Sequence, residues 1–101
     1  MATIDPTKLR SYTWFNGKEY YNFSRRANLR SMGFSREIFF GKPVIGIINT
    51  WSEINPCHAH LRVRADNVKR GVLQAGGFPI ELPAISLSES FVKPTTMMYR
   101  N

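Results

Sequence analysis

The stretch from Pro43 to Asn49 reads PVIGIIN, and it decides the class of fold that this sequence predicts. It is a continuous apolar run rich in β-branched residues, without the alternation of a strand that has one wet face. It therefore predicts a strand covered on both faces, as in a parallel sheet. A long helical pattern follows from about Pro56 to Ala75, and Gly76 and Gly77 terminate it. A second short strand is expected over Phe78 to Leu82. Strand, helix and strand make a βαβ unit, which indicates the α/β class.

The residues before the first strand are expected to form an arm and two short helices. Residues 1–22 show no regular pattern and predict an irregular N-terminal arm. Helices are predicted over Arg25 to Met32 and over Arg36 to Phe40, each preceded by a serine that can cap it and followed by a glycine. The last residues, from Pro94 onward, look like the beginning of another helix. We therefore expect one domain, with the arm first and then, over residues 23–101, a partial parallel-sheet unit that begins a larger α/β domain.

Length and composition limit the class of protein. With 101 residues the chain makes at most one domain, and its 43% hydrophobic and 21% charged residues are typical of a chain that folds. No stretch approaches the ~20 apolar residues of a membrane span, and the first residues have neither an apolar signal core nor a cleavage site. We expect a cytoplasmic protein without a membrane partner. The single cysteine excludes an internal disulfide framework.

The formal net charge is +7, and much of it lies before residue 43. Eight of the fourteen lysines and arginines are there, against three acids, and they are scattered among aromatic residues rather than gathered in a run. Three interpretations stay open: a solvated face, a surface that meets another domain or subunit, and a site for nucleic acid or another polyanion. Nothing resembles a zinc finger, a helix-turn-helix or an RNP strand, so nucleic acid is not the favoured partner.

The segment NTWSEINPCHAHLR, residues 49–62, contains the only cysteine and both histidines of the chain. Asn55 is a favoured N-cap and Pro56 suits the first helical position, so we expect Cys57 in the first turn of the long helix. That turn follows the carboxyl end of a parallel strand, where open α/β sheets bind ligands. The helix dipole and unpaired N–H groups there favour a thiolate, which predicts a nucleophile or a metal ligand. A small buried cysteine under the loop is the alternative.

Cys57 and its neighbouring histidines do not complete a familiar site. His60 is three residues beyond Cys57 and shares its helical face, whereas His58 points elsewhere. Two ligands are too few for a closed, tetrahedral zinc site. A nucleophilic pair of Cys57 and His60 stays conceivable, but no third residue is identified that would orient it. An iron–sulfur cluster needs several cysteines, so any others would come from elsewhere.

Two ordered segments carry a family resemblance. PVIGIINTWSEINPCHAHLR, residues 43–62, and VKRGVLQAGGFPIELPAISLSESFVKPTTMMYRN, residues 68–101, resemble the N-terminal portion of the dihydroxy-acid and phosphogluconate dehydratase family. Within it, the closer likeness is to the sugar-acid branch, the arabinonate, xylonate and galactonate dehydratases. The similarity extends from about Leu9 to Asn101. Members of the family are several times longer, with a larger α/β domain followed by a β-rich domain, so this chain is expected to correspond to the beginning only.

The resemblance implies roles for particular residues. In the family, the cysteine of the Asn-Pro-Cys segment is one of three that hold an iron–sulfur cluster, 2Fe-2S or 4Fe-4S, and here that position is Cys57. The acid of the SLSES segment, Glu89, matches a carboxylate that binds a catalytic magnesium ion, a hard cation that suits oxygen ligands. His60 recurs in the family pattern, which implies a place behind the cluster ligands or facing the substrate, with ordinary packing as the alternative.

Two residues depart from the family pattern. His58 stands where sugar-acid members often have Asn, and we expect it on the surface or donating a hydrogen bond toward a cluster sulfide or a substrate oxygen. Ser88 stands where they often have Gly. If the φ angle at Ser88 is positive, the Glu89 loop must be placed differently, because serine lacks the conformational freedom of glycine.

The implied reaction removes water from a 2,3-dihydroxy acid, giving an enol that becomes a 2-oxo-3-deoxy acid. Cluster iron would act as a Lewis acid on the C3 hydroxyl, and magnesium would stabilise charge at the carboxylate and the C2 oxygen. The other family ligands and the base lie later in the sequence, so the 101-residue chain is expected to be inactive alone. The intact enzyme is expected to take a sugar acid and to be a homo-oligomer. The alternatives are a dihydroxy-acid dehydratase of branched-chain amino acid synthesis, a non-catalytic remnant or docking subunit, and a basic binding module.

Overall fold

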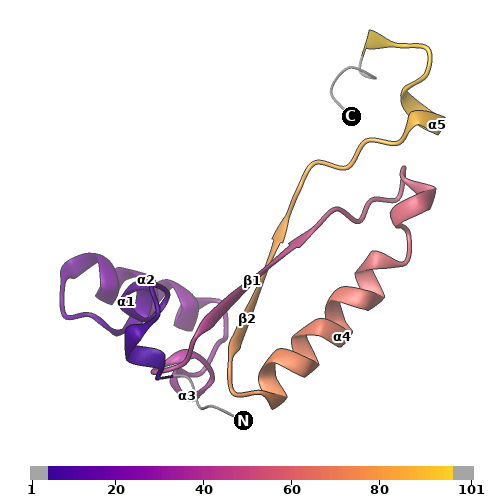
Figure 1. The fold of residues 1–101 in the computed structure, drawn as a ribbon. Helices are drawn as coiled ribbons and strands as arrows, with labels where there is room; N and C mark the ends of the chain where they lie inside the picture. The colour runs from indigo at the N-terminus through magenta and orange to yellow at the C-terminus, as the bar shows by residue number, and fades with distance from the viewer. Residues whose placement is uncertain (1–4, 97–101) are drawn as a thin grey trace. The chain divides into compact units, whose positions relative to one another are not determined.

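The computed structural model describes residues 5–96, which form helices and one pair of strands (Figure 1). The elements, in chain order, are η1 (Pro6–Lys8), α1 (Tyr12–Asn16), α2 (Tyr20–Ser31), α3 (Arg36–Phe39), β1 (Val44–Asn49), η2 (Pro56–His58), α4 (Leu61–Gln74), β2 (Phe78–Pro83) and α5 (Glu89–Val92). The helix expected from Pro94 onward runs into residues 97–101, which lie outside the described part of the chain. It stays a prediction.

The two strands pair in parallel, as the sequence predicts. At one end, the backbone N–H of Phe78 donates to the carbonyl of Pro43 (2.8 Å), and at the other end Ala84 donates to Asn49 (2.9 Å). The bonded positions advance together along both strands, which is the register of a parallel pair. With α4 between the strands, the α/β class is confirmed.

Two glycines end α4 as predicted. Gly76 has φ +90°, and its N–H donates to the carbonyl of Leu73 (3.1 Å), while Gly77 donates to Val72 (2.9 Å). This pair of bonds is a Schellman motif, and it satisfies carbonyls that have no partner inside the helix. The chain can therefore turn directly from the helix into β2.

The start of the long helix differs from the prediction. The pattern from Pro56 predicted one continuous helix, but residues 56–58 form the separate 3₁₀ turn η2, and α4 begins only at Leu61. Asn55 makes no side-chain cap bond to the turn. Its amide donates to the hydroxyl of Ser86 instead, so a contact with a residue distant in the sequence competes with a regular helix start.

The N-terminal residues are more regular than the expected arm. α1 lies within residues 1–22, α2 begins at Tyr20 rather than after Ser24, and Ser24 is inside that helix. The carbonyls that close α1 are satisfied from α2, because Arg26 donates to Phe15 (2.6 Å) and to Gly17 (2.8 Å). These partners are nine and eleven residues apart in the sequence, so a local pattern does not reveal them. The stops at Gly33 and Gly41 are confirmed, since both have positive φ angles.

Within the described residues the chain forms two compact units, residues 5–45 with 72–79 and residues 46–71 with 80–96. The core of the first unit is aromatic. Phe78 is 1% exposed and its ring lies 5.3 Å from that of Phe34, 5.9 Å from that of Phe39 and 6.2 Å from that of Phe15, measured between centroids. Such edge and tilted contacts are favourable beyond the apolar area that they bury.

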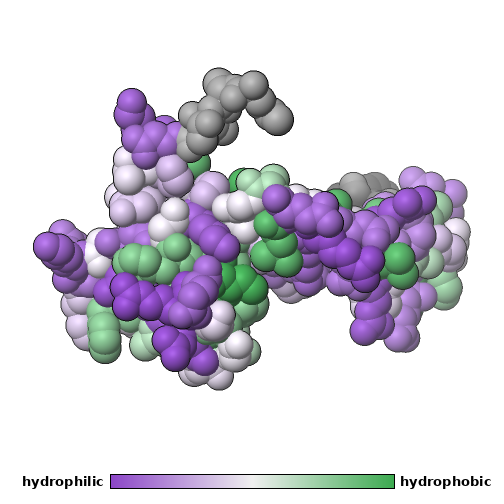
Figure 2. Space-filling view, turned by 90° about the horizontal axis from the view of Figure 1, so that it is seen from below, coloured by the Kyte–Doolittle hydropathy of each residue, from purple (hydrophilic) through white to green (hydrophobic). Residues whose placement is uncertain are grey.

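β1 is not covered on both faces within the described residues, contrary to the prediction. Ile45 is 43% exposed and Ile48 is 74% exposed. The sheet of the described residues has only two strands, and burying both faces of a strand needs elements packed on both sides. Figure 2 shows hydrophobic surface (green) between hydrophilic regions (purple). The apolar run thus predicts a strand correctly, but not its environment in this chain.

Candidate functional site

The Asn-Pro-Cys segment lies in a turn of the second unit that is anchored by a buried amide. Asn55 is 3% exposed, and its side-chain Nδ2 donates to the hydroxyl of Ser86 (2.7 Å). Pro56 opens η2, and the N–H of His58 donates back to the carbonyl of Asn55 (3.0 Å). The buried amide therefore holds the turn that carries Cys57, whose side chain is exposed.

His58 is half-buried and lies among polar groups of the chain, whereas the sequence predicted a surface position or a hydrogen bond toward a cluster sulfide or a substrate oxygen. Its Nδ1 lies 3.1 Å from the Thr50 hydroxyl, 3.2 Å from Asn55 Nδ2, 3.2 Å from the Thr50 carbonyl and 3.3 Å from the Ser86 hydroxyl. We call these four residues, Thr50, Asn55, His58 and Ser86, the polar clasp. It joins the segment after β1 to the segment after β2.

Cys57 differs from the sequence prediction in its position relative to the long helix. The thiol is exposed, which removes the buried, inert alternative. Cys57 also lies in η2, ahead of α4, so it is not in the first turn of the long helix whose dipole was expected to act on it. His60 is exposed between the two elements and does not share a helical face with Cys57; its carbonyl accepts from Arg64 N (3.2 Å).

A self-contained metal site is absent from the described residues. Nowhere in residues 5–96 do three or more His, Cys, Asp or Glu side chains group so that they could hold an ion. Cys57, His58 and His60 do not form such a group. Any cluster bound through Cys57 needs ligands from outside this set.

Glu89 is the first residue of α5, which the sequence did not predict. Ser88 is its N-cap with a buried side chain, and the Ser88 hydroxyl accepts from Ser90 N (3.3 Å). The φ angle at Ser88 is −107°, so serine needs no left-handed conformation there. The Glu89 carboxylate is exposed, and Lys93 Nζ lies 3.8 Å from it. The group is held loosely and is open to a ligand.

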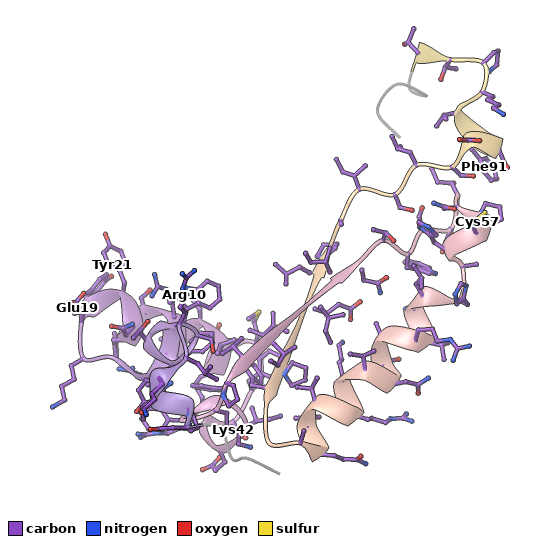
Figure 3. The ribbon with its side chains drawn as sticks, viewed as in Figure 1. Arg10, Glu19, Tyr21, Lys42, Cys57 and Phe91 are labelled. Atoms are coloured by element: carbon purple, nitrogen blue, oxygen red, sulfur yellow. The ribbon has the colours of Figure 1, made fainter. Side chains whose placement is uncertain are left out.

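Figure 3 shows Cys57 on its turn and Phe91 on α5.

A further carboxylate, which the sequence analysis missed, stabilises the second unit. Glu81 on β2 pairs with Lys69 Nζ of α4 (2.6 Å) and accepts from Asn49 Nδ2 of β1 (2.8 Å). The hydrogen bond from Lys69, and then that from Asn49, lower the pKa of Glu81 below its ordinary value. This residue joins the helix to both strands and is structural. No local motif identifies it, because its partners lie on other elements.

The first unit contains a basic groove of about 560 Å³. Four cations line it, together with aromatic side chains: Lys18, Arg26, Arg30, Arg36, Phe23, Phe39 and Phe40. The lining includes no acid, and among the described residues none of these cations forms an ion pair. The guanidinium of Arg26 bonds only neutral carbonyls, and that of Arg36 lies over the Phe40 ring, 4.1 Å from its centroid. The groove therefore combines positive charge with aromatic side chains, which suits an anion that has an apolar part.

Comparison with known proteins identifies the class. Residues 42–100 match the family described as the dihydroxy-acid/6-phosphogluconate dehydratase N-terminal domain, and the chain belongs to this family. The matched range contains both the Asn-Pro-Cys turn and the SLSES segment. The resemblance drawn from the sequence is thereby confirmed.

Among its relatives are named sugar-acid dehydratases. The chain is 58% identical to the 6-deoxy-6-sulfo-D-gluconate dehydratase of Pseudomonas putida over 94 residues, which cover 93% of this chain and 16% of that protein. It is 50% identical to the L-arabinonate dehydratase of Rhizobium leguminosarum, over 95% of this chain and 17% of that protein. A dihydroxy-acid dehydratase of Koribacter versatilis is 52% identical over 63% of the chain and 11% of that protein. The chain thus spans about one sixth of the length of the first two relatives.

None of the helices in residues 5–96 has the length and apolar character that crossing a bilayer requires.

Proposed function

We propose that this chain carries the first part of a hydro-lyase that dehydrates a 2,3-dihydroxy sugar acid to a 2-oxo-3-deoxy acid. Family membership and the names of the similar relatives support a dehydratase. The observation that carries the proposal is the polar clasp. Through Asn55 and His58 it ties the Cys57 turn to Ser86, two residues before the cap of the helix that Glu89 begins. A dihydroxy-acid dehydratase of branched-chain amino acid synthesis is the alternative within the family.

The donor chemistry of the two segments fits the two proposed cofactors. Cys57 offers an exposed sulfur, the soft ligand that an iron–sulfur cluster takes. Glu89 offers an exposed carboxylate, the hard ligand that magnesium takes. His60 is exposed beyond the turn, and we assign it a supporting place near the cluster or substrate. Each segment supplies one ligand of its kind, so each site is incomplete in this chain.

When bound, the cluster supplies a Lewis acid for the departing C3 hydroxyl and magnesium supplies positive charge for the developing enolate. Cys57 would present its sulfur from a turn that the buried Asn55 amide fixes. Glu89 would present its oxygens from the first turn of α5, whose N-terminus Ser88 caps. The loose contact with Lys93, at 3.8 Å, is easily exchanged for a divalent cation.

A segment exchange tests this function. The residues of this chain that match the L-arabinonate dehydratase of Rhizobium leguminosarum replace the corresponding residues of that enzyme, and the hybrid is assayed with L-arabinonate and with a branched-chain 2,3-dihydroxy acid. We expect dehydration of the sugar acid. A hybrid that folds and binds iron but dehydrates only the branched-chain acid would favour the alternative, and one that is folded but inactive on both would contradict the proposal.

The basic groove favours a second candidate, an anion-binding module. The observation behind this candidate is the four cations of its lining, none of which forms an ion pair within residues 5–96. Binding of a single-stranded oligonucleotide to the 101-residue chain should then fall with salt with a slope of about −0.7 for each phosphate neutralised. Arg30→Gln, at the groove, should weaken binding, whereas Arg70→Gln, at an exposed site on α4, should not. Equal losses in both variants would show a diffuse charge effect and remove this candidate.

A further inference from the structure

We propose that His58 is a positioning residue whose Nδ1 atom locks the Cys57 turn to the segment that leads to Glu89. The relevance to metal binding rests on the proposed function. The lock itself rests on the contacts of the polar clasp, all of which lie within one compact unit. His58 would not touch the substrate. It would set where the two ligand-bearing segments lie.

The contacts of His58 converge on one ring nitrogen. Nδ1 lies within 3.3 Å of groups from three places in the sequence, namely Thr50 after β1, Asn55 at the start of the turn, and Ser86 after β2. No contact of Nε2 is found among the described residues. The contacts of the polar clasp therefore depend on Nδ1, the ring nitrogen nearer the backbone.

The donors around Nδ1 indicate its protonation. Asn55 Nδ2 has two hydrogens, one for Ser86 Oγ at 2.7 Å and one for His58 Nδ1 at 3.2 Å. The hydroxyls of Thr50 and Ser86 can donate as well, whereas only the Thr50 carbonyl, at 3.2 Å, needs a proton from the ring. The hydroxyls can donate or accept, but the second Asn55 hydrogen has no acceptor other than Nδ1 among the described contacts, so the proposed lock requires Nδ1 to accept and the neutral ring to carry its proton on Nε2.

Loss of the Nδ1 contact should be costly because the Asn55 amide is buried. Asn55 is almost fully buried, and every buried side-chain polar atom among the described residues has a partner. Removing Nδ1 leaves one Asn55 hydrogen without an acceptor, which is costly in a site shielded from water. The turn and the Ser86 segment would then open more often. The effect should reach α5, because the buried Ser88 cap lies two residues beyond Ser86.

Two amide substitutions separate the role of Nδ1 from simple loss of a ring. Asn places a polar atom near the position of Nδ1, whereas Gln places its amide near the position of Nε2. Amide hydrogen exchange is measured by NMR in the 101-residue chain for wild type, His58→Asn and His58→Gln. In His58→Gln we expect exchange of Ala59 N–H in the turn and Ser90 N–H in α5 to rise together by about fivefold, the effect of losing one typical hydrogen bond. His58→Asn should stay near wild type.

The same experiment can overturn the proposal. Equal exchange in the two variants, or a rise at Ala59 without one at Ser90, contradicts the lock. A double substitution with Ser86→Ala adds a check. Ser86→Ala should raise exchange in wild type and add little in the His58→Gln background, because the two residues act through one network. Full additivity contradicts it.

A wild-type measurement decides the matter if His58→Gln fails to fold. A long-range ¹H–¹⁵N spectrum about two pH units above the usual histidine pKa of about 6.5 distinguishes the ring nitrogen that carries the proton. A proton on Nε2 supports the proposal, and a proton on Nδ1 overturns it. These results test only the contacts of His58 Nδ1, and not the binding of iron. A segment-exchange hybrid that lacks iron while the lock is intact would instead reject the proposed function.

Discussion

Asn55 donates a 2.7 Å hydrogen bond from its buried side-chain amide to the hydroxyl of Ser86, across 31 residues of sequence. This bond joins the segments that follow the two parallel strands. In open α/β sheets, the carboxyl ends of the strands are where ligands bind. The bond thus brings together the parts of the chain that the family resemblance marks for cofactor binding.

Asn55→Ala should lower the free energy of unfolding by about 1–3 kcal/mol, because it removes a buried hydrogen-bonded amide and leaves its partners unsatisfied. Urea unfolding of the 101-residue chain measures the change. Asn67→Ala, at an exposed site on α4, is the matched control and should change stability by less than about 0.5 kcal/mol. Equal losses in both variants would mean that the Asn55 bond does not stabilise the unit.

Phe78→Ala should destabilise the chain by about 3–5 kcal/mol, since a fully buried ring is lost from an aromatic core. In a domain this small, such a loss removes much of the total stability and should abolish a cooperative thermal transition. Phe91→Ala, which truncates a ring that is 57% exposed, should leave the transition in place. A cooperative transition in Phe78→Ala near the wild-type midpoint would contradict the described core.

Two glycines on and after α4 should respond to alanine in opposite directions. Gly76 has φ +90°, so Gly76→Ala should destabilise by about 1–2 kcal/mol. Gly71 lies inside the helix with no atom near its added Cβ, so Gly71→Ala should stabilise by about 0.5–1 kcal/mol. Thermal unfolding of the two variants gives the sign directly. A Gly76→Ala variant that is as stable as wild type would contradict the Schellman ending of α4, and a destabilised Gly71→Ala variant would contradict the open space described at Gly71.

Glu81 should make stability depend on pH. Its folded pKa is lowered by Lys69 and Asn49, so the stabilisation is present above the ordinary value of 4.5 and is lost as the pH falls through the lower folded value. The stability advantage of wild type over Glu81→Gln should therefore shrink when urea unfolding is repeated below pH 4.5. Glu53→Gln, at an exposed carboxylate without an ion pair among the described contacts, is the control. If the stability advantage of wild type over Glu81→Gln grew as the pH fell, the described contacts of Glu81 would be contradicted.

The 101-residue chain alone should not dehydrate sugar acids, even after reconstitution with iron, sulfide and magnesium. The described residues contain no group of three metal-binding side chains, and Cys57 is the only cysteine. The measurement is formation of 2-oxo acid from a panel of sugar acids. Turnover by the isolated chain would show that the sites are complete without further ligands.

The sequence predicted those parts of the fold that depend on local signals. The apolar run of β1, the glycine stops and the parallel βαβ order all follow from neighbouring residues. It failed where distant side chains compete with local pattern. Asn55 has the sequence of a helix cap, but it bonds to Ser86, so the turn η2 replaces the expected first turn of α4.

In the candidate site too, the sequence indicated some residues, whereas others became evident only from the fold. The position of Cys57 after a predicted strand indicated a nucleophile or a metal ligand, and the family resemblance added the expectation of an iron–sulfur cluster. Glu89 was predicted from the resemblance alone, because an exposed acid carries little signal. Ser86 and Thr50 were missed, since a hydroxyl becomes informative only when the fold places it beside a buried amide or ring. His58 was predicted as a surface residue for the same reason.

The most direct test of the central claim is the iron and sulfide content of the segment-exchange hybrid with and without Cys57→Ser. We predict that the hybrid binds an iron–sulfur cluster with visible absorption, and that Cys57→Ser greatly reduces both the absorption and the bound iron, while Ser52→Ala, in the same loop, retains them. A Cys57→Ser hybrid that keeps its full cluster would contradict the assignment of Cys57 as a ligand.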